Sequence, residues 1–448
     1  MSEQYDLIVI GGGPGGVAAA QKAAAENKSV LVIEKEGWGG TCANRGCIPT
    51  KALLTCSKHY TNIKKFKRLG INTSEASIDF TAIKRHQQQA VKIAALGAHK
   101  TLADAQVETR FGLGKILSPQ EIEYKDREGN TKTFTAKNII IAWGAKPQIL
   151  PEIELSGRIL TSDGLLNLEN LPGSIIIVGA SVIGVEFATF FAELGVKVTL
   201  IELMERILPY EDQETAELLR QELTRLGVSI HTSANLKSLA DTGSSVAAKV
   251  QTGDEQFDKT AAYALLCTGR QPLLNAEELN KLNIDYSKAG IKVDSNMMTN
   301  IAGIYAVGDV TGGMLLAHRA AAQGEVAANH ICAQQPATYN ENHIPSVIYS
   351  HPQIARVGNI QQSAGIQIIK SEYSANIVAR MELINYGFAK AFFQDDKIIG
   401  ATIVGNDAGE LIVPLALAVS NEMTKTQLRN WVIPHPALGE IFAPFISG

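Results

Sequence analysis

Two glycine-rich turns, one in each half of the chain, limit more than any other feature what this sequence can fold into. Each turn follows a short apolar run and precedes a helical stretch, a second apolar run and an acidic residue. At one constant offset, Gly11 matches Gly179, Gly16 matches Gly184, and Glu34 matches Glu202. Strand, glycine turn, helix and strand in this order form a βαβ unit with parallel strands. The repeat predicts an α/β fold with two Rossmann-like dinucleotide-binding domains.

The first turn has the spacing G-x-G-x-x-G, with Gly11, Gly13 and Gly16. Gly11 permits the tight turn, Gly13 lets a pyrophosphate approach the backbone, and Gly16 lets helix and strand pack closely. The helix that follows offers amide donors and a positive dipole end to phosphates. Glu34 ends the next apolar run, where a carboxylate accepts hydrogen bonds from ribose hydroxyls. These residues predict a dinucleotide site.

The second turn departs from this pattern because Ser181 replaces the middle glycine. Its hydroxymethyl group would either crowd a pyrophosphate or donate a hydrogen bond to it. Glu202 has the same separation from Gly184 as Glu34 has from Gly16, and it favours a free 2′-hydroxyl and repels a 2′-phosphate, which predicts NAD. Arg206 is the feature that favours NADP, since a guanidinium there could bind the phosphate.

Cys42 and Cys47 lie in a glycine-flanked segment, Gly-Gly-Thr-Cys-Ala-Asn-Arg-Gly-Cys-Ile-Pro-Thr-Lys, that we expect to form a turn at the start of a helix. A helix N-terminus stabilises a thiolate, the reactive form of cysteine. A zinc site would need a second pair of Cys or His at metal spacing, so no metal is predicted. Lys51 follows Cys47 by one helical turn. The segment predicts a reactive cysteine pair with a lysine beside it.

Two further positions have both a structural and a functional interpretation. Asp309, in Gly-Asp-Val-Thr-Gly, is either an Asx-turn residue or an acceptor for a hydroxylated cofactor tail. His435 and Glu440 are close together near the end of the chain. A histidine oriented by a carboxylate is the arrangement that deprotonates a thiol or hydroxyl, although a lone histidine is more often a surface residue.

Composition excludes several classes of protein. The 448 residues include 41 basic and 45 acidic side chains, a net charge of −4, which argues against a nucleic-acid or polybasic membrane surface. No apolar run reaches the ~20 residues of a membrane span. The first apolar run begins at Leu7, too early to leave room for a signal peptide. Five cysteines do not suit a secreted disulfide scaffold in a chain of this length. We expect a cytoplasmic protein.

Taken together, these motifs resemble the flavoprotein disulfide reductases, the class I pyridine nucleotide-disulfide oxidoreductases. The resemblance covers essentially the whole chain in the family's order. It is carried by the Gly11–Gly16 turn with Glu34, Cys42 and Cys47 running into Lys51, the second turn with Glu186 and Glu202, Thr268-Gly269-Arg270, Gly308-Asp309, Leu316-Ala317-His318, and His435 with Glu440. The family implies FAD and NAD as cofactors, and cofactor-binding positions also at Gly114 and Gly144.

The resemblance implies four domains, each with a part in cofactor binding or dimerisation. Residues 1–145 would bind FAD, residues 146–263 would bind NAD, residues 264–335 would form a central domain that completes the FAD site, and residues 336–448 would form an α+β dimer interface. Weakened periodicity and prolines at 147, 151 and 172 mark the boundary that follows the first domain.

The resemblance also assigns roles to the reactive residues. Cys47 would face the flavin as the charge-transfer cysteine, and Cys42 would exchange with substrate. Lys51 and Glu186 would form an ion pair near flavin N5 and the nicotinamide, and Asp309 would contact the ribityl chain.

The base would be His435, held in place by Glu440. In a homodimer, each subunit would supply its His435 to the active site of the other.

The implied activity is oxidation of protein-bound dihydrolipoamide to lipoamide. A substrate thiolate would attack Cys42 of a Cys42–Cys47 disulfide, and the electrons would pass through FAD to NAD⁺. The partners would be lipoyl domains of 2-oxoacid dehydrogenase or glycine cleavage complexes.

Three departures from the family pattern are Trp143 in place of a small threonine, Ser181, and Pro434 before the candidate base. The alternatives are a glutathione-type reductase, a mercuric-ion reductase and a flavin-binding redox sensor without turnover. The first usually has basic residues near the position of Glu202, and these are largely missing. The second needs a cysteine pair beyond Cys332, and none is present.

Overall fold

The computed structural model describes residues 3–333 and 339–447. The chain divides into two compact units, each built from three segments. The first unit comprises Met1–Ala52, Lys84–Gln148 and Gly269–Tyr339, and the second comprises Leu53–Ile83, Ile149–Thr268 and Asn340–Gly448. The predicted domain boundary at residues 335 and 336 lies outside the described residues.

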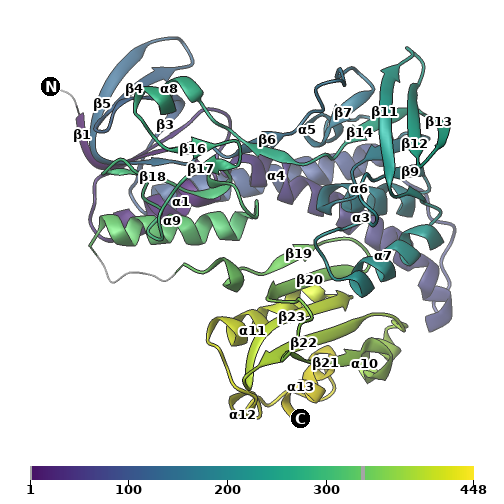
Figure 1. Cartoon of the computed structure of the whole chain (residues 1–448). Helices are drawn as coiled ribbons and strands as arrows, with labels where there is room; N and C mark the ends of the chain where they lie inside the picture. The colour runs from purple at the N-terminus through teal and green to yellow at the C-terminus, as the bar shows by residue number, and fades with distance from the viewer. Residues whose placement is uncertain (1–2, 334–338, 448) are drawn as a thin grey trace. The chain divides into compact units, whose positions relative to one another are not determined.

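A six-stranded sheet forms the centre of the first unit (Figure 1). Its strands are β1 (Glu3–Ile10), β2 (Val30–Glu34), β3 (Glu108–Ser118), β4 (Glu121–Asp126), β5 (Thr131–Ile141) and β18 (Ile304–Ala306). β1 pairs in parallel with both β2 and β5, and β18 extends the parallel part beyond β5, whereas β4 is antiparallel to β3 and β5. The register pairs Ile10 with Ile33 and with Ile141, so the carboxyl ends of these strands meet at one edge.

Both faces of β2 and of the second half of β1 are buried, as expected for parallel strands inside a sheet. Alternate residues of β1 belong to different hydrophobic clusters, because successive side chains of a strand point to opposite faces. Leu7 and Val9 pack with α1 (Pro14–Ala25) and α9 (Ala317–Ile331), whereas Ile8 and Ile10 pack with Phe134 and its neighbours on the other face.

Helices α1 and α9 lie against each other (Figure 1). Glycines at the contact allow the two backbones to come close. A Cβ at Gly324 would lie 2.3 Å from the carbonyl oxygen of Gly15, and a Cβ at Gly15 would lie 2.9 Å from that of Ala320. Larger residues cannot occupy these positions, so the two helices have one closely defined relative placement.

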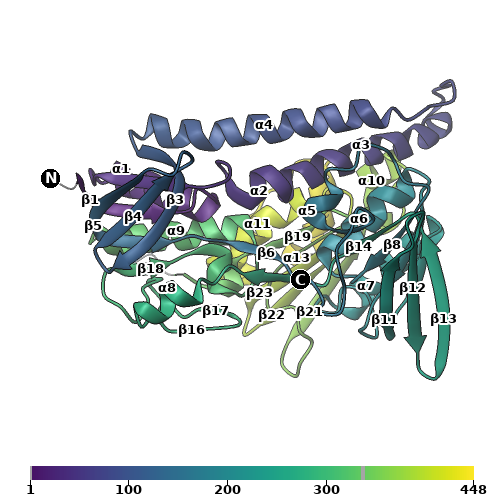
Figure 2. The ribbon, with the colours of Figure 1, turned by 90° about the horizontal axis from the view of Figure 1, so that it is seen from above.

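The first unit also contains shorter elements that carry or flank the candidate site. They are α2 (Gly40–Arg45), the start of α3 (Cys47–Phe66), most of α4 (Phe80–Asp104), β6 (Ala145–Pro147), β15 (Arg270–Pro272), α8 (Ala276–Lys281), β16 (Tyr286–Ser287), β17 (Gly290–Ile291) and a 3₁₀ helix at Gly308–Thr311. Figure 2 shows α2 and α3 in succession.

The second unit contains a five-stranded parallel sheet in the order β10-β9-β8-β14-β7. The strands are β7 (Ile159–Thr161), β8 (Ser174–Val178), β9 (Lys197–Ile201), β10 (Ser229–His231) and β14 (Tyr263–Leu266). The helices of this part are α5 (Ser162–Leu165), α6 (Val182–Glu193) and α7 (Gln213–Arg225). A three-stranded antiparallel sheet is made of β11 (Ala234–Asp241), β12 (Val246–Thr252) and β13 (Glu255–Ala261).

The remainder of the second unit is an antiparallel sheet with short helices. Its strands, in spatial order, are β19 (Ser346–Ile348), β20 (Gln353–Gly358), β23 (Lys397–Gly405), β22 (Phe388–Gln394) and β21 (Gln367–Glu372). The helices are α10 (Ile377–Met381), α11 (Ala408–Ser420), α12 (Lys425–Leu428) and α13 (Ala443–Ser447), with 3₁₀ turns at Lys67–Leu69, Glu341–His343, Tyr373–Ala375 and Leu438–Phe442. The predicted fold class, two dinucleotide-binding folds with a C-terminal α+β part, is confirmed.

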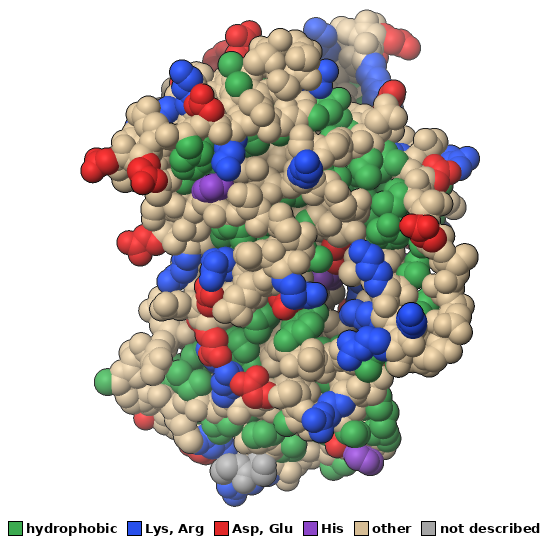
Figure 3. Space-filling model, turned by 90° about the vertical axis from the view of Figure 1, so that its right-hand side faces the viewer, with side chains coloured by type: hydrophobic (Ala, Val, Ile, Leu, Met, Phe, Trp, Pro, Cys, Tyr) green, Lys and Arg blue, Asp and Glu red, His purple; other side chains and the backbone are tan. Residues whose placement is uncertain are grey.

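Charges of both signs are intermixed on the face that Figure 3 shows, as the small net charge predicts. Within residues 3–333 and 339–447, no helix combines the length and apolar content of a membrane span.

A buried carboxylate links three segments of the second unit. Glu193, at the end of α6, accepts a hydrogen bond of 2.6 Å from Ser57 Oγ and lies 2.7 Å from His351 Nδ1. Ser57 is on α3, and His351 follows β19. The Glu193 carboxylate therefore connects α6 with α3 and with the loop that follows β19.

We expect Glu193→Ala to lower the free energy of unfolding by about 3 kcal/mol, because it removes a buried carboxylate that two polar groups share. His351 loses this acceptor, and the fully buried Ser57 keeps only its 3.1 Å hydrogen bond to the Leu54 carbonyl oxygen. Urea denaturation measures the change. The control is Glu217→Ala, which removes an exposed ion pair with Arg220 on α7 and should cost at most about 0.5 kcal/mol. Equal effects of the two substitutions would contradict the structural role of Glu193.

Candidate functional site

The first glycine turn lies at the carboxyl end of β1 and admits no side chain at two positions. Gly11 has φ +118°, and a Cβ there would lie 2.2 Å from the carbonyl oxygen of Ala142. A Cβ at Gly16 would lie 2.0 Å from the carbonyl oxygen of Gly11. Gly13, the N-cap of α1, differs, because the nearest atom to its Cβ position is 3.9 Å away. Gly13 therefore has the open space that a ligand phosphate would need.

Glu34 is held by the backbone of this turn. Its Oε2 accepts a hydrogen bond of 2.7 Å from the Gly12 amide, and its Oε1 accepts from the amides of Glu36 at 2.6 Å and Gly37 at 3.1 Å. A carboxylate has about four acceptor positions, so three amides leave room for one further donor such as a ribose hydroxyl. The arrangement suits the predicted nucleotide site, and it also orders the turn itself.

The second turn repeats this arrangement. Glu202 Oε2 accepts from the Ala180 amide at 2.6 Å, and Oε1 accepts from the Met204 amide at 2.8 Å. The amides that donate to the two carboxylates occupy equivalent positions in the repeat. Ala180 matches Gly12, and Met204 matches Glu36. The internal repeat therefore extends to the hydrogen bonds that position each carboxylate.

The structure places Arg206 in its own loop. Its Nη2 donates to the carbonyl oxygens of Pro209 at 2.9 Å and Glu211 at 3.2 Å, and its Nε is buried with no hydrogen-bond partner in the described part of the chain. These contacts favour Glu202 over Arg206 as the determinant of nucleotide choice. Ser181 is the N-cap of α6, and its side chain makes no capping hydrogen bond.

The cysteine pair lies at the junction of two helices, not in the turn that the sequence predicts. Cys42 is inside α2, Cys47 is the first residue of α3, and Gly46 ends α2 between them. Glycines usually indicate a turn, but here Gly39 and Gly40, with φ of +82° and +57°, form the start of a helix. Both cysteines are thiols in the structure.

Several neighbours act on the Cys42 thiol. A hydrogen bond to Cys47, together with burial, raises the pKa of Cys42 far above its usual value. The negative charge of Asp309 raises this pKa further, whereas the Lys51 ammonium lowers it. Cys42 therefore holds its proton more tightly than an ordinary cysteine. The structure brings Cys47, Lys51 and Asp309 within electrostatic range of Cys42.

Asp309 is a half-buried acidic residue in the field of two arginines. Burial raises the pKa of its carboxyl group, and Arg270 and Arg319 oppose that rise. The preceding amide, of Gly308, donates a 2.8 Å hydrogen bond to the side chain of Gln323 on α9. Gln323 belongs to no sequence motif, and the one sign of it in the sequence is a polar residue on the buried face of a helix.

Trp38 is a second residue that no sequence motif indicates. Its ring lies against the first turn, since a Cβ at Gly12 would come within 2.8 Å of it. The ring stacks on His99 at 5.1 Å between centroids and meets the edge of Phe111 at 6.2 Å. These contacts join three segments distant in sequence, which no local pattern reveals.

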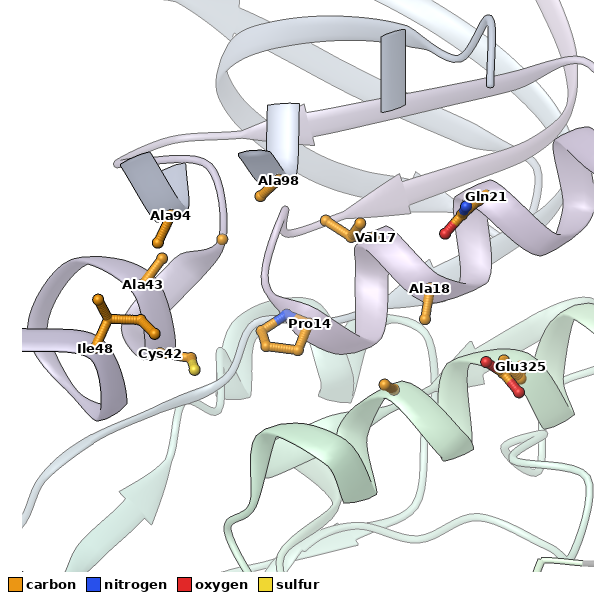
Figure 4. A pocket seen from close by; sticks show the side chains of 12 residues that line it. Pro14, Val17, Ala18, Gln21, Cys42, Ala43, Ile48, Ala94, Ala98 and Glu325 are labelled. Atoms are coloured by element: carbon orange, nitrogen blue, oxygen red, sulfur yellow. The ribbon is translucent and has the colours of Figure 1, made fainter. Parts of the chain in front are cut away.

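A pocket of about 420 Å³ in the first unit has Cys42 in its wall (Figure 4). Apolar residues and glycine make up most of its wall. The lining residues are Pro14, Val17, Ala18, Gln21, Gly39, Cys42, Ala43, Ile48, Ala94, Ala98, Ala321 and Glu325. An apolar cleft with a cysteine in its wall can bind the carbon chain of a sulfur-containing substrate.

The C-terminal histidine and glutamate lie in contact in the second unit. His435 Nδ1 is 2.9 Å from Glu440 Oε2, and Glu440 Oε1 accepts from the Ala437 amide at 2.7 Å. These hydrogen bonds lower the pKa of Glu440, and the one with His435 has the largest effect. The His435 side chain is 74% exposed, so its other ring nitrogen is accessible.

Glu186 is buried on α6 and accepts a 2.9 Å hydrogen bond from the Tyr349 amide. Because Lys51 belongs to the first unit and Glu186 to the second, the predicted ion pair between them stays a prediction.

The other predicted cofactor positions lie in varied settings, and their roles stay predictions. Gly114 is inside β3, where a Cβ would meet Ile10 and Ile33 at 3.3 Å. Gly144 and Gly269 have φ of +78° and +110°. Leu316 is the N-cap of α9, which starts with Ala317 and His318. The unusual Trp143 packs against the hydrophobic cluster of the first sheet.

Sequence comparison defines the class of protein. Residues 5–324 match the pyridine nucleotide-disulphide oxidoreductase family, and residues 344–444 match the dimerisation domain of that family. The chain belongs to the pyridine nucleotide-disulphide oxidoreductases. Membership confirms the predicted enzyme class and the two predicted cofactors, FAD and NAD.

Individual relatives cover nearly the whole chain. A dihydrolipoyl dehydrogenase of Bacillus subtilis is 35% identical over 97% of this chain and 96% of its own length, and that of Chlorobaculum parvum is 36% identical over 98% and 96%. Among solved structures, LpdA from Mycobacterium tuberculosis superposes with a TM-score of 0.93 at 29% identity and 99% coverage of both chains. The Cu(II) complex of the HOCl-induced flavoprotein disulfide reductase RclA from Escherichia coli has a TM-score of 0.86 at 25% identity, also with 99% coverage of both chains.

The geometry of the second turn predicts a preference for NAD⁺ over NADP⁺ of roughly a hundredfold in kcat/KM, equivalent to about 2–3 kcal/mol. A 2′-phosphate would meet the charge of Glu202 and lose a hydrogen bond. In Glu202→Gln, which removes the charge and keeps the shape, we expect the preference to fall about tenfold.

The control is Glu205→Gln, which neutralises an exposed carboxylate in the same loop. Steady-state kinetics with both nucleotides gives the ratios. Similar kcat/KM values for NAD⁺ and NADP⁺ in the unaltered protein would refute the assignment of Glu202.

Proposed function

We propose that this chain is a dihydrolipoyl dehydrogenase, which oxidises protein-bound dihydrolipoamide to lipoamide and reduces NAD⁺. One observation carries the proposal. The Cys42 thiol lines an apolar pocket and hydrogen-bonds to Cys47, so a dithiol substrate that enters the pocket reaches a redox-active pair. The names and full-length similarity of the curated relatives support the same substrate.

The pocket wall suits an aliphatic dithiol. Five alanines, Val17 and Ile48 offer apolar contacts to a carbon chain, and the lining residues include no lysine, arginine or histidine. Glutathione disulfide, the substrate of one alternative, carries several carboxylates that would need such cations. A mercuric-ion reductase would need a cysteine pair near the C-terminus, and no cysteine follows Cys332.

Cys42 and Cys47 perform the exchange with substrate. In the oxidised pair, a substrate thiolate attacks the sulfur of Cys42, the Cys42–Cys47 bond breaks, and Cys47 leaves as a thiolate. The second substrate thiolate then attacks its own sulfur in the mixed disulfide and releases Cys42. The substrate becomes a disulfide and the protein pair becomes a dithiol. The high pKa of Cys42 lets it take up one proton, and the Lys51 ammonium lies close enough to stabilise the negative charge.

The base for the substrate thiol would be His435, oriented by Glu440. The match of residues 344–444 to a dimerisation domain includes both residues and supports a homodimer. We propose that each active site takes its cysteines from one subunit and its histidine from the other. The exposure of His435 is consistent with such a shared site.

The first glycine turn, with Glu34 and Asp309, would hold FAD, and the second turn, with Glu202, would hold NAD. FAD, when bound, supplies the two-electron chemistry that links a dithiol to a nicotinamide. Lys51 and Glu186 would stand near the reacting rings. We propose the four-domain division at residues 145, 263 and 335 on the same basis.

The partners would be lipoyl domains of 2-oxoacid dehydrogenase or glycine cleavage complexes, and the location would be the cytoplasm. The low cysteine content, five in the whole chain, suits a reducing compartment. A steady-state assay with dihydrolipoamide, glutathione disulfide and both nicotinamides tests the substrate. Absence of NAD⁺ reduction by dihydrolipoamide in flavin-loaded protein would overturn the proposal, and would favour a redox sensor.

The two cysteines should differ in their spectra. We expect Cys42→Ser to keep a long-wavelength charge-transfer band, because Cys47 remains as a thiolate toward the flavin, and Cys47→Ser to lose it. Absorbance spectroscopy of the purified flavin-loaded variants distinguishes them. The reverse pattern would exchange the two assignments.

Mixed dimers test the shared site. Homodimers of Cys42→Ser and of His435→Gln should each be nearly inactive toward dihydrolipoamide. Co-expression should restore a substantial fraction of activity, because one site of the mixed dimer has an intact cysteine pair and an intact histidine. If mixed dimers are present and activity stays at the level of the variants, each site lies within one chain.

A further inference from the structure

The pocket that Cys42 lines also has a carboxylate in its wall. Gln21, on α1, and Glu325, on α9, lie away from Ile48 in Figure 4, whereas Cys42 lies nearer to it. Gln21 contributes the one amide side chain and Glu325 the one carboxylate among the twelve residues that line this pocket. A substrate with its sulfur atoms at Cys42 would direct its tail toward them.

Helix geometry fixes the positions of these two residues. Pro14, Val17, Ala18 and Gln21 have the spacing of one face of α1, and the distance along the axis from the first to the last is about 10 Å. On α9, Glu325 follows Ala321 by one turn. Because α1 and α9 meet through Gly15 and Gly324, their relative placement is closely defined, and Glu325 is held beside the pocket.

The charge of Glu325 has little local compensation. Lys22, which follows Gln21, is in an ion pair of 2.8 Å with Glu26, and that hydrogen bond is the main cause of the raised pKa of Lys22. Glu325 contributes to the same pKa only weakly. Among the twelve residues that line the pocket in one subunit, none is a cation and Glu325 carries the one formal charge.

We propose that Glu325 makes this pocket select dithiols by the charge of their tail, and favours neutral or cationic tails over carboxylates. The inference rests on the proposed function and makes it more specific. Lipoyl groups joined to protein as amides have a neutral tail, whereas free dihydrolipoate ends in a carboxylate. Glu325 would therefore direct the enzyme toward the protein-bound form and away from the free acid.

The expected discrimination is modest because Glu325 is exposed. Two like charges several ångströms apart at a surface give about a threefold to tenfold difference in kcat/KM at low salt. The difference should shrink at high salt, since the screening length falls from about 10 Å at 0.1 M to about 3 Å at 1 M.

Three dithiols with the same ring and carbon chain test the proposal: dihydrolipoate, dihydrolipoamide and the aminoethyl amide of dihydrolipoate, with tail charges of −1, 0 and +1. In the unaltered enzyme, kcat/KM should be lowest for the acid by the factor given above. Glu325→Gln should flatten the series, and Glu325→Lys should reverse it. The matched control is Glu128→Gln, which makes the same change of net charge at the turn between β4 and β5 and should leave the series as it is.

A measurement without turnover separates this inference from the proposed function. In Cys47→Ser, the rates at which cationic and anionic methanethiosulfonates modify Cys42 are followed by peptide mass spectrometry. Glu325→Gln should lower the cationic-to-anionic ratio several-fold, and Glu128→Gln should not. If no dithiol is oxidised but this ratio changes, the proposed function fails and charge selection stands. If the dithiol series is flat in the unaltered enzyme, or if Glu325→Gln leaves both readouts unchanged, charge selection is wrong.

Discussion

The close approach of backbone to backbone at the glycine turns is the constraint on which the rest of this structure depends. In each βαβ unit the helix begins so near the preceding strand that a methyl group at Gly16 or Gly184 would collide with a carbonyl oxygen at about 2 Å. The collision partner is Gly11 in one unit and Gly179 in the other. This contact fixes the start of α1, and α1 in turn supplies one wall of the pocket at Cys42 and packs on α9. The chemistry at the sulfur atoms is therefore positioned by packing that involves no reactive residue.

The redox pair owes its electrostatics to groups from two distant segments. The hydrogen bond to Cys47, burial and the charge of Asp309 raise the pKa of the Cys42 thiol, whereas the Lys51 ammonium lowers it. Lys51 stands one turn beyond Cys47 on α3, and Asp309 comes from a distant part of the sequence. The balance of these groups, and not the cysteines alone, sets how tightly Cys42 holds its proton.

Local patterns predicted the strands and helices well where the pattern was long and periodic. The apolar runs before the two glycine turns are β1 and β8, and the helical stretches that follow them are α1 and α6. Glycines around Cys42 predicted a turn, but tertiary contacts allow a short helix there. The sequence did not predict Gln323, Trp38 or the pocket residues. Each of them matters because of its contacts with a segment far away in sequence. Side-chain identity revealed the acids and cysteines, whereas no residue pattern could reveal a cavity shared by α1, α4 and α9.

The carboxylates that follow the apolar runs of β2 and β9 are held by main-chain amides, at Gly12, Glu36 and Gly37 in one unit and at Ala180 and Met204 in the other. Every residue except proline presents an amide, so the identity of most of these donors is free to change. Such a site tolerates substitutions around the acid, as Ser181 at the position of Gly13 and Ala180 at the position of Gly12 show. The two copies differ at these positions and keep the same hydrogen-bonding plan, so each can be altered for a different nucleotide without disturbing the other.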